Sequence, residues 1–217
     1  ILEVSREHGV KKVIVPSSIA AFGPVTPDNP SEFTIQRPTT MYGITKVFGE
    51  LLADYYFAKY GLDVRGVRYP GIISWKTEPG GGTTDYAVAV YYEALRTGRY
   101  AYFVRKDTVL PMMYMPDALK ALVDLAGADG SRLRHRTYNV ASMSFSAGEL
   151  TDAVQHLLPD FRATYEPDQR QAIADSWPQR LDDRAAREDW NWAPAWDIHR
   201  MSQDMVENLR AKFAAPK

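Results

Sequence analysis

The fold of this chain is decided by Val13-Ile14-Val15-Pro16-Ser17-Ser18-Ile19-Ala20-Ala21-Phe22-Gly23. Its apolar, β-branched start predicts a buried strand over residues 11–17. Two hydroxyls stand where that strand ends, and a proline-rich loop follows over 22–38. A second segment, Tyr42-Gly43-Ile44-Thr45-Lys46, opens a helix that the apolar spacing predicts over residues 40–60. One strand end and one helix start therefore bring together a hydroxyl, a phenol and an ammonium.

The Tyr-x-x-x-Lys spacing occurs three times, at Tyr42/Lys46, Tyr55/Lys59 and Tyr102/Lys106, so position has to select among the pairs. The Tyr102 pair begins in a predicted strand, where its two Cα atoms would stand about 13 Å apart. The Tyr55 pair lies near the far end of the helix, roughly 20 Å from the strand end. Only Tyr42 and Lys46 are i,i+4 neighbours in the first turns. We therefore take this pair as the candidate site.

The predicted helix has two different faces. Its apolar stripe consists of Ile44, Val47, Phe48, Leu51, Leu52 and Tyr55. The opposite face carries Tyr42, Lys46, Gly49 and Ala53, and such small residues suggest that something packs closely there. The alternative is a solvated face with an ordinary surface lysine. The stripe needs a cover, which is either the sheet or the same helix of a second subunit.

The three side chains suit proton transfer. A free tyrosine titrates near pH 10, and a cation one turn away favours the phenolate, which can accept the proton of a substrate hydroxyl. Ser18 could bond the same oxygen and orient it. Taken alone, Ser17-Ser18 would read more simply as a polar turn.

Composition is that of a globular α/β protein. Hydrophobic residues make up 45% of the 217, charged residues 24%, and the net charge is −1, which suggests neither a nucleic-acid nor a membrane partner. There is no cysteine, and the four histidines show no metal-ligand spacing, so no metal is expected.

The remaining pattern alternates strands with helices, which predicts a parallel sheet. Strands are expected at 63–69, 100–104, 109–114, 136–140 and 161–165. Helices are expected at 84–97, 116–127, 146–158, 182–190 and 197–213, with a loop over 70–82. Ser146 and Glu149 form a capping-box signal, and Thr83 or Thr84 is the expected N-cap of the helix over 84–97, with Asp85 in its first turn.

Several motifs together resemble the extended short-chain dehydrogenase/reductases. They are the Ser-Ser-x-x-x-x-Gly strand end, Tyr-Gly-x-x-Lys-x-x-x-Glu, Val67-Arg68-Tyr69-Pro70-Gly71-Ile72-Ile73, Met115-Pro116-Asp117-Ala118, and Asp189-Trp190-Asn191-Trp192-Ala193-Pro194. The resemblance implies a Rossmann-like doubly wound parallel sheet with a smaller C-terminal substrate lobe. Residues 1–70 would be the C-terminal half of the dinucleotide-binding domain. Residues 71–217 would supply the last sheet strands and the lobe.

The same resemblance implies site residues and a cofactor. Ser18, Tyr42 and Lys46 would be catalytic, and NAD would contact Ser17, Tyr42, Lys46, Tyr69, Pro70 and Ile72. It also implies a cytoplasmic homodimer formed through the helix that carries Tyr42. The family's glycine-rich pyrophosphate turn is absent from this sequence. We therefore expect about 90 to 100 preceding residues to carry it in a parent protein, so this chain should bind NAD poorly.

The substrate is suggested by two further features. The branch that acts on nucleotide-diphosphate sugars often carries an arginine where this chain has Leu110, and leucine cannot make a bidentate contact with phosphate. Pro-Gly-Ile-Ile-Ser followed by Gly-Gly-Gly-Thr-Thr-Asp-Tyr-Ala is similar to the epimerase-like L-threonine 3-dehydrogenases. This likeness implies that threonine is oxidised at its 3-hydroxyl and is bound by Ser18, Tyr42, Ser74, Thr83, Thr84 and Asp85. For that loop, the alternative is a flexible linker. For the function of the whole protein, the alternatives are a nucleotide-sugar epimerase and a non-catalytic Rossmann-like binding protein.

Overall fold

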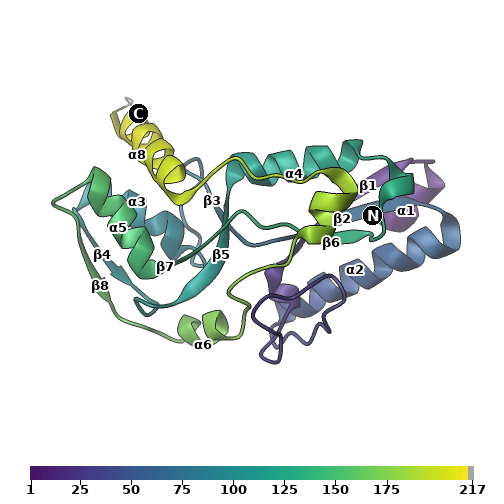
Figure 1. Cartoon of the computed structure of the whole chain (residues 1–217), viewed down its shortest axis with the longest axis horizontal. Helices are drawn as coiled ribbons and strands as arrows, with labels where there is room; N and C mark the ends of the chain where they lie inside the picture. Colours follow the sequence, from purple (N-terminus) through teal and green to yellow (C-terminus); the bar gives the residue numbers. More distant parts are fainter. Residues whose placement is uncertain (215–217) are drawn as a thin grey trace.

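The molecule consists of a sheet with helices on both faces and a smaller lobe beside it (Figure 1). The computed structural model describes residues 1–214. The sheet contains three parallel strands in the order β1-β2-β6. They span Lys12–Ser18 (β1), Asp63–Tyr69 (β2) and Thr137–Asn139 (β6). Ser17 pairs with Arg68 and Ser18 with Tyr69, so β1 and β2 end at the same edge of the sheet.

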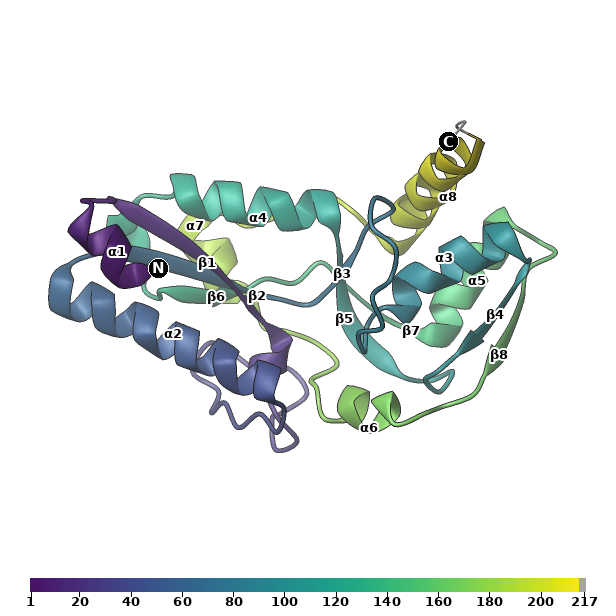
Figure 2. The ribbon, with the colours of Figure 1, turned by 180° about the vertical axis from the view of Figure 1, so that it is seen from behind.

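Helices lie on both faces of this sheet (Figure 2). They span Leu2–Glu7 (α1), Met41–Tyr60 (α2), Met115–Gly127 (α4) and Arg184–Trp190 (α7). On the α1/α2 face, Ala53 and Val64 belong to a small core. On the other face, Leu125 and Trp190 belong to a larger one. The sheet is therefore doubly wound, which confirms the predicted Rossmann-like α/β class.

The long helix α2 begins and ends at well-formed caps. The Thr40 hydroxyl accepts a hydrogen bond from the Gly43 amide at 3.1 Å. At the other end, Gly61 adopts the left-handed conformation with φ of 67°, which stops the helix. These signals are local in sequence, which is why the predicted range of 40–60 agrees with the structure.

The apolar stripe of α2 points away from the sheet. Its most exposed members are Ile44, Phe48, Leu51 and Tyr55, with 48 to 64% of their surface accessible. The sheet instead contacts the small and polar face, where Gly43, Glu50 and Ala53 are buried. The interpretation of the sheet as the cover of the stripe is therefore wrong. The stripe remains available to a second subunit.

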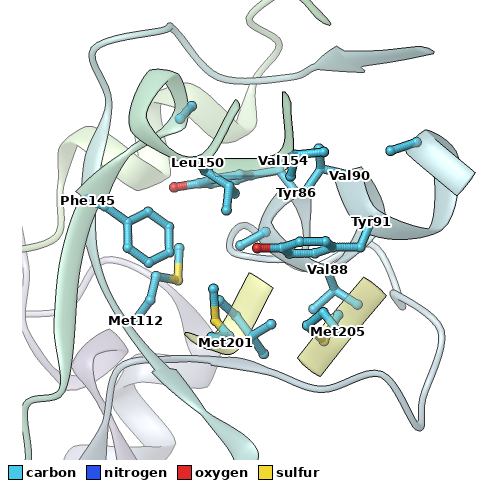
Figure 3. Packing of buried hydrophobic residues seen from close by; sticks show 14 of the residues in the cluster. Tyr86, Val88, Val90, Tyr91, Met112, Phe145, Leu150, Val154, Met201 and Met205 are labelled. Atoms are coloured by element: carbon cyan, nitrogen blue, oxygen red, sulfur yellow. The ribbon is translucent and has the colours of Figure 1, made fainter. Parts of the chain in front are cut away.

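Within the described residues, the lobe is built from two small sheets, three longer helices and the short helix α6 (Arg170–Asp175). One sheet has the order β3-β5-β7, with β3 and β5 parallel and β5 and β7 antiparallel, and the other pairs β4 with β8 in parallel. The strands span Gly71–Ile73 (β3), Arg99–Tyr102 (β4), Val109–Tyr114 (β5), Met143–Ser146 (β7) and Arg162–Tyr165 (β8). The longer helices are Tyr86–Arg96 (α3), Ala147–Leu157 (α5) and Ile198–Ala214 (α8). Their shared core, shown in Figure 3, includes Tyr86, Tyr91, Phe145, Met201 and Met205.

Some short elements differ from the expectations. The predicted loop over 70–82 contains β3, and the sequence pattern does not reveal β7 or the six-residue helix α6 (Arg170–Asp175). Asp85, rather than Thr83 or Thr84, holds the N-cap position of α3, without a side-chain capping bond. The capping box of Ser146 and Glu149 is confirmed. Within residues 1–214, no helix combines the length and apolar character needed to cross a membrane.

Candidate active site

The carboxyl end of β1 leads into a single turn of 3-10 helix, η1 (Ile19–Ala21). Ser18 is its N-cap, and the Ser18 hydroxyl oxygen accepts a hydrogen bond from the Ala20 amide at 3.2 Å. A serine hydroxyl that accepts one bond still has its hydrogen to donate. The turn therefore fixes the direction of Ser18 while leaving it able to bond a substrate oxygen.

Gly43 allows α2 to contact this turn directly. A Cβ at Gly43 would lie 2.1 Å from the Ala20 carbonyl oxygen and 2.6 Å from the Pro38 Cβ. Only glycine permits such an approach. Tyr42 precedes Gly43, and Ser18 lies two residues before Ala20. The contact therefore brings the helix start that carries Tyr42 against the strand end that carries Ser18, as the sequence predicts.

Lys46 lies between Tyr42 and β1. Its ammonium donates a hydrogen bond to the Pro16 carbonyl at 2.8 Å and sits 5.3 Å from the centre of the Tyr42 ring. The Tyr42 side chain is 56% exposed. An ammonium carries three donors, so the bond to Pro16 leaves others for a ligand. The ammonium of Lys46 and the phenol of Tyr42 therefore lie next to each other near the end of β1.

A cleft of about 730 Å³ brings the predicted residues together. Its lining includes Ser17, Ser18, Tyr42, Lys46, Tyr69, Pro70, Ile72, Thr83, Thr84 and Asp85. Ser74 is not among the lining residues, and its hydroxyl instead accepts a hydrogen bond from the Lys76 amide at 3.2 Å. Its part in substrate binding stays a prediction.

Two of the lining residues turn their side-chain oxygens elsewhere. The Ser17 hydroxyl donates to the buried carboxylate of Glu50 on α2. The Tyr69 hydroxyl donates to the Ala118 carbonyl of α4, and burial raises the Tyr69 pKa above its ordinary value. The phenol proton of Tyr69 is therefore already engaged in a bond within the protein.

The glycine-rich loop at the cleft is organised by Asp85. One oxygen of its carboxylate accepts hydrogen bonds from the amides of Gly80, Gly81 and Gly82 at 2.7, 2.8 and 2.9 Å. Gly81 has φ of 98°, a conformation that favours glycine. The loop is thus shaped by its own hydrogen bonds to Asp85 at the start of α3. Thr83 and Thr84 lie between the bonded amides and α3.

The other end of the same loop is attached to the C-terminal helix. The Lys212 ammonium of α8 donates to the carbonyls of Trp75 and Lys76 at 3.3 and 3.1 Å. The Tyr92 hydroxyl of α3 donates to the same Trp75 carbonyl at 2.6 Å. Both ends of the loop are therefore bound to helices of the lobe.

A second Tyr–Lys pair tests how far the spacing alone can be used. The Lys59 ammonium donates directly to the Tyr55 hydroxyl at 2.6 Å, and this bond lowers the Tyr55 pKa. Tyr55 nevertheless lies on the exposed stripe of α2, outside the residues that line the cleft. Location therefore distinguishes the candidate pair from its neighbour on the same helix.

Sequence reasoning missed one wall of the cleft. Ile173 of α6 and Trp177 just beyond it line the cavity together with the predicted residues. Trp177 packs against the lobe core and also against the small core of Ile19, Phe22 and Leu181. A helix of six residues without a side-chain cap gives little periodic signal. The large Trp177 before a proline, in a polar stretch, is the signal that was present.

The chain has close relatives among known sequences. Residues 1–141 match the family described as NAD dependent epimerase/dehydratase. The chain is 49% identical over 217 residues to a Staphylococcus saprophyticus protein named as an uncharacterized epimerase/dehydratase, covering 99% of this chain and 68% of that protein. It is 48% identical over 208 residues to mitochondrial L-threonine 3-dehydrogenase of Bos taurus, covering 95% of this chain and 56% of the bovine enzyme. The chain thus spans only part of the length of these relatives.

Solved structures give the same result. L-threonine dehydrogenase from Phytophthora infestans superposes with a TM-score of 0.95 at 50% identity, covering 97% of this chain and 69% of that one. UDP-glucose 4-epimerase from Thermotoga maritima, at 23% identity, has a TM-score of 0.84 over 98% of this chain and 67% of that one, and shows a shared fold alone. The family match over residues 1–141, together with the likeness to the Phytophthora infestans structure, shows that the chain belongs to the NAD dependent epimerase/dehydratase family.

Proposed function

We propose that the protein oxidises the 3-hydroxyl of L-threonine with NAD, giving 2-amino-3-ketobutyrate. The observation that carries this proposal is the single cleft that Ser18, Tyr42 and Lys46 share with Thr83, Thr84 and Asp85. The first three supply proton-transfer chemistry, and the last three supply hydroxyls and a carboxylate. The identity of about half the residues to L-threonine dehydrogenases supports the choice of substrate.

The donor set fits the nicotinamide half of NAD. The Lys46 ammonium and the Tyr42 hydroxyl lie at the carboxyl ends of parallel strands, where ligands of such folds bind. Residues Pro70–Ile72 bring the backbone that follows β2 to the same cleft. We infer that Lys46 holds the ribose and that the segment around Ile72 contacts the ring. When bound, NAD accepts the hydride that the substrate carbon loses.

The protein's own groups handle the proton. The Tyr42 oxygen takes the proton of the threonine hydroxyl, so that the O–H bond of threonine breaks while its carbon–oxygen double bond forms. Ser18 donates a hydrogen bond to the same oxygen and orients it. Thr83 and Thr84 offer hydroxyls to the carboxylate of the amino acid. Asp85 offers negative charge to its ammonium, although the loop amides already bind one of its oxygens.

A nucleotide-diphosphate sugar is a poorer substrate for this cleft. Leu110, which stands where the sugar-nucleotide branch often carries an arginine, lies on β5 with no exposed surface. It belongs to the core of the lobe, so this position offers no charge to a diphosphate. The likeness to the T. maritima epimerase extends to the fold and gives no support for its substrate.

We further propose a homodimer through α2. The exposed stripe of this helix is apolar, and a two-fold axis would pair it with itself. We also propose the division suggested by the sequence, with residues 1–70 in the dinucleotide-binding domain and 71–217 mixed between sheet and lobe. The cytoplasmic location remains a prediction from family resemblance.

The decisive experiment is oxidation of L-threonine by the full-length protein with NAD, followed at 340 nm. The Tyr42→Phe variant keeps the ring and removes the oxygen, so we expect turnover to fall by about 10² or more with the fold intact. Tyr55→Phe is the matched control and should change turnover little. Near-normal turnover of the Tyr42→Phe enzyme would contradict the mechanism. Absence of threonine oxidation by the unmodified protein would contradict the substrate assignment.

A further inference from the structure

A buried ion pair connects α2 to the sheet. Glu50 and Arg68 are 6% and 5% exposed. The Arg68 Nη2 donates to Glu50 Oε2 at 2.7 Å, and its Nε lies 3.0 Å from both oxygens of that carboxylate. The Ser17 hydroxyl donates to Glu50 Oε1. One carboxylate therefore joins the helix α2 to both β1 and β2.

The Glu50–Arg68 pair lies close to the candidate catalytic residues along α2. Glu50 follows Lys46 by one helical turn and Tyr42 by two, so the three lie along the same side of α2. Lys46 bonds the Pro16 carbonyl, and Glu50 bonds the next residue, Ser17. Two successive turns of the helix are therefore tied to two successive residues of β1. Ser18 is the residue that follows them.

The remaining bonds of the pair are also satisfied inside the protein. The Gln36 side-chain amide donates to Glu50 Oε2 at 2.8 Å. Arg68 Nη1 donates to the Asn139 side-chain oxygen on β6 at 3.3 Å. The Asn139 side-chain amide in turn donates to the Pro30 carbonyl at 2.9 Å. The network thus extends from α2 through the sheet to the proline-rich loop.

Stability alone does not account for a buried pair of this kind. Removing two charges from water is costly, and well-packed apolar residues of similar volume often stabilise a core equally well. What an apolar pair lacks is directional bonds that fix one element at a single register against another. We propose that Glu50, held by Arg68, is a positioning residue that sets the register of α2 on β1 and so aligns Tyr42 and Lys46 with Ser18.

The proposal rests on the function proposed for the cleft and adds a requirement to it. If Glu50 loses its charge or Ser17 its hydroxyl, α2 gains freedom to slide along β1. Tyr42 and Lys46 would then move together relative to Ser18. Proton transfer with hydride loss would slow, because small displacements of reacting groups have large effects on rate.

The test compares the variants Glu50→Gln and Ser17→Ala with Asp63→Asn in the full-length protein. Asp63 is the control because its carboxylate binds Arg65 at 2.7 Å and Arg136 at 3.2 Å, partners that lie on or beside β2 and β6 instead of on α2. For each variant, kcat, the KM for threonine, the Kd for NAD and the deuterium isotope effect with threonine labelled at C3 are measured. Hydrogen exchange of the amides of residues 41–46 is followed without substrate.

We expect kcat to fall about tenfold or more in Glu50→Gln and severalfold in Ser17→Ala. The isotope effect should rise because the chemical step is slowed, and the Kd for NAD should rise as well, because Lys46, which holds the ribose, moves with Tyr42. A merely structural role would lower the active fraction without raising the isotope effect, and that result would overturn the proposal. An equal loss of kcat in Asp63→Asn would overturn it as well.

Two outcomes need a separate readout. If Glu50→Gln does not fold, Ser17→Ala, which leaves the ion pair in place, decides the question by the same criteria. If the unmodified protein does not oxidise threonine, the proposed function fails, and hydrogen exchange still decides the role of Glu50. Faster exchange at 41–46 in Ser17→Ala, with unchanged exchange in Asp63→Asn, supports the positioning role, and unchanged exchange in both refutes it.

Discussion

Replacing Gly43 by alanine tests how closely α2 must approach the turn after Ser18. The new Cβ would lie 2.1 Å from the Ala20 carbonyl oxygen, whereas real Cβ contacts essentially never fall below 3.0 Å. The helix start therefore has to withdraw by about 0.9 Å. The neighbouring atoms belong to a backbone carbonyl and to the ring of Pro38, neither of which can rotate out of the way.

The expected effects follow from that displacement. A misplacement of about 1 Å in an active site can lower the rate by about 10²-fold. Overpacking of this kind costs about 1 to 3 kcal/mol of stability, which exceeds the gain of about 1 kcal/mol that alanine has over glycine in a helix. Gly43→Ala should therefore lose both turnover and stability.

Gly49→Ala is the control on the same helix. Nothing lies within 4 Å of a Cβ at Gly49. This variant should gain the helix propensity of about 1 kcal/mol, or roughly 2 to 4 °C in melting temperature for a domain of this size, with normal turnover. Threonine oxidation and thermal melting followed by circular dichroism measure both effects. Near-normal turnover in Gly43→Ala would refute the argument that this contact places Tyr42.

Other predictions concern the cofactor, assembly and pH. Lys46→Met should weaken NAD binding, and an unchanged Kd would make Lys46 an ordinary surface residue. Leu51→Asp should convert dimers to folded monomers in sedimentation, because Leu51 is 62% exposed in the single chain, and a monomeric unmodified protein at micromolar concentration would contradict the dimer. Burial lowers the pKa of His135 below its ordinary 6.5, so the unfolded chain takes up the proton first. Neutral His135 therefore contributes to stability above pH 6.5, and this contribution is lost as the pH falls below 6.5. When the pH is lowered from 7.5 to 5.5, the free energy of unfolding should decline less in His135→Gln than in the unmodified protein.

Local patterns predicted the frame of the fold well. The strand that ends at Ser18 and the helix that starts after Thr40 carry signals within a few residues of their boundaries. The choice of Tyr42 and Lys46 also needed only element geometry. Their convergence with Thr83 and Asp85 in one cleft came from family resemblance, because the loop that carries those residues is distant in sequence.

The orientation of α2 was not predictable from its apolar pattern. The usual rule places the apolar stripe against the sheet. Here the sheet offers Ser17 and Arg68, which bind the charged Glu50, and the helix turns that side inward. A buried ion pair joins residues 18 positions apart in the sequence, and no helical period reports such a partner. The short strand β3 and helix α6 were missed for a related reason, since tertiary contacts determine them.

Trp177 has a consequence for how this protein could be recombined with its relatives. It packs against the core of the lobe and against the core below the turn after Ser18. The chain beyond it runs along the proline-rich loop, where the Arg180 and Asp182 amides donate to the Asp28 and Pro30 carbonyls, each at 3.1 Å. A chimera that exchanges the lobe at residue 70 would cut through these contacts. A lobe should be exchanged without loss of stability only when the proline-rich loop 22–38 is exchanged with it, so these two distant segments are expected to diverge together.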